Sequence, residues 1–399
     1  METSLQEGCR GGLMSEPKIR LAYLDGLRGL AAFYVFLNHL YLEIEWRLGN
    51  TELPPLVQSA IACLVHGRFA VAVFIVLSGY CLMLPIARGN NRSGILDYFK
   101  RRGRRILPPY YAALFLSLLL FALIPGVLNS TMGYHWNHVQ PAFKPSVVLS
   151  HALLIHNFRL DWVYKINGPM WSVATEWQIY FLFPLILLPV WRRLGILAAV
   201  CTAFTIGLMP HYLVPDSIDD EYKFLDWAVP WHLGLFSLGM TGALIGFSRK
   251  PSLIWLREKF PWNILCLGLI IGLLTLRFHW QDDRVWLVDA LVGAIVACQL
   301  IYCTQFLTTA SNKQRPLILQ LLDSHWAVLL GSFSYSLYLV HSPLLGISHL
   351  LANTLPVSPV VQLWTFTLLA VPLVLLLSYL FHLAFERRFM HYPTKEVLQ

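Results

Sequence analysis

An arginine and a histidine eleven residues apart lie in an otherwise apolar stretch near the beginning of the chain. Arg28 and His39 enclose the sequence Gly-Leu-Ala-Ala-Phe-Tyr-Val-Phe-Leu-Asn, which predicts a helix. Eleven residues at about 100° each return to within roughly 20° of the starting direction, so both side chains share one face, about 16 Å apart along the axis. Because imidazole exchanges protons near neutral pH, His39 is a candidate general base.

The less specific interpretation of this segment is an interfacial ion pair and a histidine bonded to a neighbouring helix. Asp25 lies three residues before Arg28, so these two side chains can pair on a helix. In apolar surroundings, however, charged and titratable side chains are costly, and function is their default interpretation. We therefore expect His39 to be catalytic, with Arg28 and Asp25 in the same site.

A basic motif, Arg101-Arg-Gly-Arg-Arg-Ile-Leu-Pro108, precedes the third apolar segment. By itself, such a cluster most often anchors a membrane helix at its cytoplasmic end. The alternative is a phosphate site, because guanidinium groups match phosphate oxygens in geometry and charge. A phosphate site on a membrane protein predicts a nucleotide-containing donor such as an acyl-CoA, held by Arg101, Arg102 and Arg105.

Two later segments place polar side chains at helical spacing. Ser172 and Glu176 fall one turn apart, and a carboxylate such as Glu176 or Asp25 could orient His39. Ser334, Tyr338 and His341 form a second stripe, although hydrogen bonds between helices would explain both stripes as well. The residues that we assign to acceptor binding or to structure are Asn167, Trp171, Ser172, Ser334, Tyr335, Tyr338 and His341.

The elements that must position these residues are long and apolar. Hydrophobic residues make up 56% of the 399 residues and charged residues only 13%, about half the usual charge of a soluble domain. We expect an all-α, polytopic transmembrane bundle of about ten spans; the segment 147–158 is too short to be one. The expected spans lie near residues 23–45, 68–87, 106–128, 171–190, 194–212, 227–247, 262–280, 285–307, 327–349 and 361–385.

The net charge of +8 is typical of basic loops on the cytoplasmic side of a membrane, and we expect no nucleic-acid partner. With ten spans, the basic loops all fall on one side, which predicts cytoplasmic N and C termini in a plasma membrane. We expect residues 1–20 and 391–399 to be cytoplasmic tails, and 21–390 to form one membrane domain. The seven cysteines have no metal-ligand spacing, so we expect neither a metal site nor a permanently bound cofactor.

In this order, the motifs resemble those of the acyltransferase-3 family of integral-membrane O-acyltransferases. The resemblance extends from about residue 20 to 390. Tyr80 stands where phenylalanine is commoner in the family. The matching pieces are Leu24-Asp-Gly-Leu-Arg-Gly29 with Arg28-x10-His39, Phe74-x3-Ser-Gly-Tyr80, Arg101-Arg-x2-Arg-Ile-x-Pro108, Asn167-x3-Trp-Ser-x3-Glu176 and Ser334-Tyr-x2-Tyr-Leu-x-His341.

The resemblance implies transfer of an acyl group, usually acetyl, from cytoplasmic acyl-CoA to a hydroxyl of a carbohydrate or glycosylated small molecule. It makes Arg28 and His39 the essential pair. We expect His39 to act as general base, with an acyl-histidine relay as the rival route. The alternative function from another class is a transporter or exporter of a polar or lipid-linked glycoside, because such a bundle also carries intramembrane His, Glu and Arg.

Overall fold

The structure is a computed structural model, and every element that it describes is a helix. The expected tails at 1–20 and 391–399 lie outside the described residues. Within the described part there is no strand, which confirms the all-α prediction. The described residues are 21–48, 63–89, 94–123, 144–213, 228–279, 285–308, 314–353 and 359–390.

The helices fall into two series along the chain. The first series is α1 (Ala22–Leu48), α3 (Gly67–Ala87), α4 (Ile95–Leu123), α6 (Pro145–Ala152), η2 (His156–Phe158), α7 (Leu160–Val163), α8 (Met170–Leu182), η3 (Phe183–Leu187), α9 (Leu188–Leu194) and α10 (Ile196–Leu213). The second is α12 (His232–Phe247), α13 (Pro251–Lys259), α14 (Trp262–His279), α15 (Val285–Thr308), α16 (Leu317–Leu322), α17 (His325–Ser332), α18 (Ser334–Asn353), α19 (Pro359–Phe381), η5 (His382–Glu386) and η6 (Arg387–Phe389).

Length and composition identify six described helices that can cross a membrane, and eight if two bent pairs each count as one span. The bent pairs are α13 with α14, at 66°, and α17 with α18, at 71°. Two of the ten expected spans therefore fall short of these requirements. The polar residues of α1 lower its hydropathy, and α12 has only 16 residues. The chain is an integral, multi-pass membrane protein.

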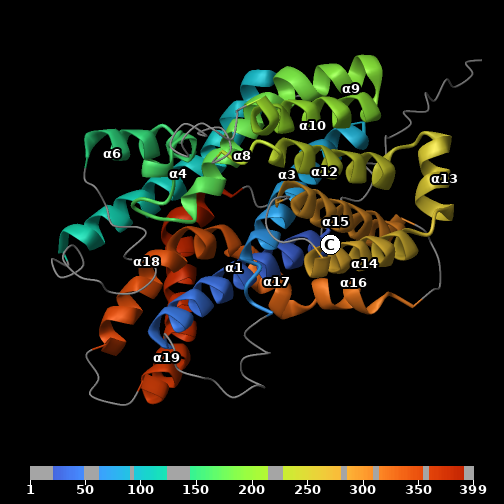
Figure 1. Ribbon diagram of the computed structural model, residues 1–399. Coiled ribbons are helices and arrows are strands. Elements are labelled where there is room, and N and C mark those ends of the chain that lie inside the picture. Colours follow the sequence, from blue (N-terminus) through green and yellow to red (C-terminus); the bar gives the residue numbers. More distant parts are fainter. Residues whose placement is uncertain are drawn as a thin grey trace, which may run out of the picture.

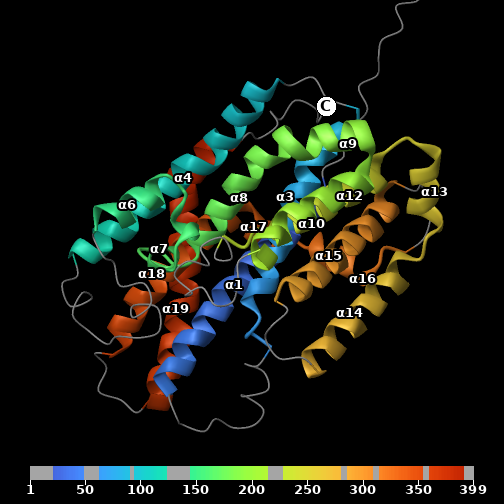
Figure 2. The ribbon, with the colours of Figure 1, turned by 45° about the horizontal axis from the view of Figure 1, so that its top comes forward.

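Helix α1 runs through the middle of the bundle (Figures 1 and 2). Both views place α18 and α19 on one side of it and α3, α12 and α15 on the other, and α1 packs directly against α3, α17 and α18. The functional motif on α1 is therefore surrounded by segments from both ends of the chain.

Glycine allows the first turns of α1 to approach the α17–α18 break closely. A Cβ atom added to Gly29 would collide with the backbone of Gly331, and one added to Gly331 would collide with the carbonyl oxygen of Asp25. The chain then bends at Phe333 into α18. This close approach brings Asp25 and Arg28 next to the beginning of α18.

Helices α3 and α12 are also in backbone contact. A Cβ atom at Gly79 would collide with the carbonyl oxygen of Phe236, and one at Gly239 with that of Val76. Small residues at such positions let membrane helices pack through their backbones. The contact fixes the position of α3, whose Ser78 faces the cavity described below.

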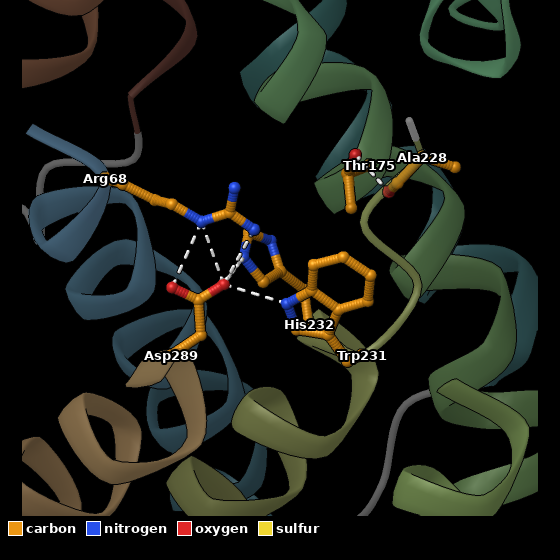
Figure 3. A network of polar contacts seen from close by, with 6 residues as sticks. All are labelled: Arg68, Thr175, Ala228, Trp231, His232 and Asp289. Atoms are coloured by element: carbon orange, nitrogen blue, oxygen red, sulfur yellow. Dashed lines mark hydrogen bonds and ion pairs between the residues drawn. The ribbon is translucent and has the colours of Figure 1, made fainter. Parts of the chain in front are cut away.

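A buried charged cluster holds one edge of α3 against α12 and α15 (Figure 3). Arg68 donates to both carboxylate oxygens of Asp289, at 2.8–3.1 Å, and Trp231 donates its indole N–H to Oδ2 of Asp289 at 2.8 Å. The imidazole of His232 lies 3.6 Å from the same oxygen. Asp289 is fully buried, so its negative charge needs partners, and these three neighbours supply them.

The expected non-spanning segment 147–158 is indeed short, and it packs on the middle of α4. Tyr110 and Tyr111 of α4 donate their hydroxyls to the carbonyl oxygens of His151 and Ala152, at 2.9 and 2.8 Å. Between α7 and α8 the chain makes a strained turn at Ile166, with φ of 63°, an unfavourable angle for a β-branched residue. The next residue, Asn167, is anchored by its amide, which donates to the Leu339 carbonyl at 2.8 Å.

We expect Gly239→Leu to destabilise the bundle by roughly 3 kcal/mol or more, since the new side chain meets backbone that has no room to move. The control is Gly268→Leu on α14, where an added Cβ meets nothing within 4 Å. Thermal unfolding in detergent, followed by tryptophan fluorescence, checks the difference. Equal melting temperatures for the two variants would contradict the α3–α12 contact.

Asp289→Ala should destabilise the protein at the lower end of the ~3–5 kcal/mol typical of broken buried pairs. The loss is limited because Arg68 is 37% exposed and can turn toward solvent. The control is Asp161→Ala, which removes an exposed partner 3.9 Å from Arg159 and should change stability little. The same unfolding assay measures both variants. An Asp289→Ala protein with the wild-type melting temperature would refute the stabilising role of the buried charged cluster.

Candidate active site

A cavity of about 960 Å³ opens among α1, α3, α4, α8, α18 and the end of α19. It lies within the size range of ligand sites in proteins. Nine of the residues singled out from the sequence line it, from the four helices α1, α4, α8 and α18. They are Asp25, Arg28, Arg102, Arg105, Ser172, Glu176, Ser334, Tyr335 and Tyr338.

One end of the cavity, the arginine end, is formed by Arg28, Arg102 and Arg105. Arg28 is held in place by Asp25, whose Oδ1 lies 3.0 Å from its Nη1, and by Cys81, whose Sγ accepts from Nη2 at 2.8 Å. These contacts join α1 to α3 at the wall of the cavity.

The other carboxylates of the cavity are also occupied by partners. Glu176 accepts hydrogen bonds from Ser78 and Tyr180. Glu386 accepts from the backbone N–H and the hydroxyl of Ser336, at 3.2 and 2.6 Å, and contacts His382 Nδ1 at 2.9 Å. Neither group forms an ion pair with an arginine among the described contacts.

Arg102 and Arg105 are left without a carboxylate partner. Within the described ranges, neither forms an ion pair, and the guanidinium of Arg102 lies over the ring of Tyr180, 5.8 Å from its centroid. Two neighbouring cations on the wall of a cavity attract an anionic ligand. Guanidinium geometry favours phosphate or carboxylate as that anion.

Tyr338 forms the part of the cavity wall nearest to His341. Its hydroxyl lies 2.6 Å from Ser172 Oγ and donates to the Pro169 carbonyl at 3.1 Å. Its ring makes edge contacts with Phe74 and with His341, at centroid distances of 5.6 and 5.9 Å. Since Tyr338 lines the cavity and His341 does not, the Tyr338 ring separates the cavity from the histidine.

Behind Tyr338, His341 meets His39 across the α1–α18 interface. His341 Nε2 lies 2.8 Å from His39 Nδ1, and His341 Nδ1 lies 3.0 Å from the Leu337 carbonyl oxygen. A carbonyl only accepts, so the Nδ1–H of neutral His341 donates to it and His341 Nε2 accepts from His39 Nδ1–H. The neutral His39 then carries its basic lone pair on Nε2. This is the tautomer that a general base requires.

Glu176 and Asp25 are the carboxylates that the sequence predicts to orient His39. Glu176 contacts Ser78 and Tyr180, and Asp25 contacts Arg28, whereas the described partner of His39 is His341. The described contacts of Glu176 and Asp25 lie in the cavity wall, and the orientation of His39 by either carboxylate stays a prediction.

Three other predicted residues lie outside the cavity. Arg101 is exposed and does not line it, although Arg102 and Arg105 do. Asn167 is buried and donates to Ser117 Oγ at 3.2 Å as well as to α18, so its contacts are structural. Trp171 packs its ring 6.0 Å from that of His232.

Several cavity residues were not identified from the sequence. No site role was predicted for Ser78, Cys81 or Glu386, but all three line the cavity. His382 and Glu386 lie on η5, a π-helical turn, and such turns are frequent at functional sites. The available signal was a histidine and a glutamate four residues apart at the end of an apolar helix.

The cavity residues that the structure describes are not arranged as a metal site. Among the residues that the structure describes, no three His, Cys, Asp or Glu side chains converge as metal ligands would. The polar groups present can bind an anion, exchange a proton and donate hydrogen bonds.

Comparison with known proteins connects these features to a family. The family model described as an acyltransferase domain matches residues 21–383. Acyltransferase MdmB of Streptomyces mycarofaciens is 26% identical over 351 residues, which cover 83% of this chain and 80% of that protein. O-acetyltransferase OatA of Staphylococcus aureus is 25% identical over 351 residues, 81% of this chain and 51% of OatA.

This chain thus corresponds to about half the length of OatA and to most of MdmB. No solved structure matches it. The family match covers the motif on α1, the arginines of α4, the turn before α8 and the stripe on α18. The chain belongs to the acyltransferase-3 family.

Proposed function

We propose that this protein is an O-acyltransferase that moves an acyl group, acetyl in the simplest case, from acyl-CoA to a hydroxyl. The observation that carries the proposal is the pair Arg102 and Arg105, which line the cavity without a carboxylate partner among the described residues. Coenzyme A brings phosphates that match such a pair. Arg28 already has Asp25 and Cys81, so its main task is to shape the arginine end.

The cavity is proposed to open to the cytoplasm, where acyl-CoA is found. Basic residues lie at the ends of several helices, and the positive-inside rule assigns such residues to the cytoplasmic side. Arg88 lies 4.3 Å from the Phe247 ring at the end of α12, and Arg257 of α13 donates to the Gly246 carbonyl at 2.9 Å. Arg387, at the end of the chain's last helix, lines the cavity itself.

His39 and His341 have different roles in the proposed chemical step. His39 Nε2 takes the proton of the acceptor hydroxyl, and the oxygen attacks the thioester carbonyl. The carbon–sulfur bond breaks, and the proton finally resides on the sulfur of free CoA. His341 holds the His39 tautomer through the Nδ1 contact at 2.8 Å. The acyl end of the donor reaches His39 only when the Tyr338 ring moves.

The acceptor is proposed to be a hydroxyl of a carbohydrate or a glycosylated small molecule. The name of one relative, O-acetyltransferase OatA, supports a hydroxyl as the acceptor group, and the carbohydrate class is what the family resemblance implies. Tyr338 and Ser172, which are already hydrogen-bonded to each other, are candidates to contact this acceptor.

Arg105→Ala should weaken acetyl-CoA binding roughly tenfold or more, because a charge-assisted hydrogen bond is lost. Arg101→Ala is the matched control, since Arg101 belongs to the same basic motif but does not line the cavity. Equilibrium binding of radiolabelled acetyl-CoA to the protein in liposomes measures both. If the two variants bind equally well, the arginine cluster is only a membrane anchor.

His39→Ala should abolish thiol release from acetyl-CoA by the purified protein in liposomes, while acetyl-CoA binding stays unchanged. His341→Gln should lower turnover by roughly 10²-fold or more, because the His39 tautomer is no longer held.

An acyl-histidine relay would show a hydroxylamine-sensitive acetyl label on the protein. Thiol release by His39→Ala at the wild-type rate would refute the assignment. Movement of a glycoside without thiol release would favour a transporter.

A further inference from the structure

Two buried polar pairs lie along the α1–α18 interface. The first is His39 with His341. The second is Glu43 with His349, whose Nδ1 lies 2.8 Å from Oε2 of Glu43. Glu43 follows His39 by four residues and His349 follows His341 by eight, so each helix carries both of its members on one face.

Glu43 is a costly residue for a membrane helix. Its side chain is fully buried and that of His349 is 4% exposed, and Leu40, Ile44 and Leu345 nearby are buried too. A buried carboxylate needs a compensating partner, and an apolar residue of similar size would be cheaper for stability. In membrane helices such groups usually serve function.

The chemistry of the first pair creates a need for this carboxylate. When His39 takes a proton, the His39–His341 pair gains a positive charge. The hydrogen-bond chain ends at the Leu337 carbonyl, which cannot accept a proton, so the charge stays on the two rings. A carboxylate one helical turn away lowers the energy of this charged state.

The carboxylates Asp25 and Glu176 line the cavity, whereas His39 and His341 do not. Asp25 pairs with Arg28, and Glu176 accepts from two hydroxyls on the cavity side of Tyr338. Glu43 lies on the same helix and face as His39, beyond the cavity. It therefore has the position that the sequence analysis assigned to Glu176 or Asp25.

We propose that Glu43, held in place by His349, is a positioning residue that stabilises the protonated His39–His341 pair during acyl transfer. The inference rests on the proposed role of His39 as general base. Glu43 touches neither donor nor acceptor in this scheme and acts only through His39.

The test replaces the carboxylate without changing its shape. Glu43→Gln should lower the kcat of acetyl-CoA thiol release roughly 10- to 100-fold, because a charge interaction across one helical turn is lost. The KM for acetyl-CoA and the melting temperature should stay at wild-type values. Glu43→Asp, which restores the charge, should recover most of the kcat. Glu45→Gln is the control, because Glu45 lies on the same helix but is exposed.

The outcomes separate this inference from the proposed function. If His39→Ala is inactive while Glu43→Gln keeps the wild-type kcat, the role of Glu43 is refuted and that of His39 stands. If His39→Ala is as active as wild type, the proposed function fails first. A Glu43→Gln protein that loses acetyl-CoA binding and melting temperature together with kcat would show a purely structural pair, and would also overturn the inference.

Discussion

Charge inside a membrane bundle needs a partner, and this constraint explains the arrangement of the site. The carboxylates that line the cavity, Asp25, Glu176 and Glu386, are each satisfied by a side chain of the protein. Arg102 and Arg105 are not, within the described residues. The protein thus keeps two cations available for a ligand, while its own anions are occupied. An anionic donor completes the site.

The helix packing places the cavity and the histidine pair along the same two helices, α1 and α18. Glycines at the α1–α17 contact bring Arg28 to the arginine end, and the 71° bend between α17 and α18 directs α18 along α1. As a result, α1 and α18 share the cavity wall first and the histidine pair further along. Tyr338 stands at the boundary between these two regions. In the proposed mechanism, the Tyr338 ring separates the bound donor from His39.

Helical periodicity predicted which residues share a face. Ser172, Glu176 and Tyr180 do line one cavity, and so do Ser334 and Tyr338. Periodicity could not predict which faces meet, since His39 and His341 are 302 residues apart and their contact depends on the whole bundle. Glu176 is a reasonable partner for His39 by composition, but its described contacts lie in the cavity wall. The count of about ten spans is not confirmed, since the described helices give six to eight and the polar residues of α1 lower its hydropathy.

The central claim is that an acyl-CoA lies with its phosphates at Arg102 and Arg105 and its acyl end near Tyr338 and His341. Photolabelling tests it without knowledge of the acceptor, using a CoA thioester whose short acyl chain carries a diazirine. Peptide mapping by mass spectrometry should place the label on α18 or on α3 near Phe74, and excess CoA should suppress it. Label confined to residues outside the cavity, or unaffected by CoA, would contradict the account.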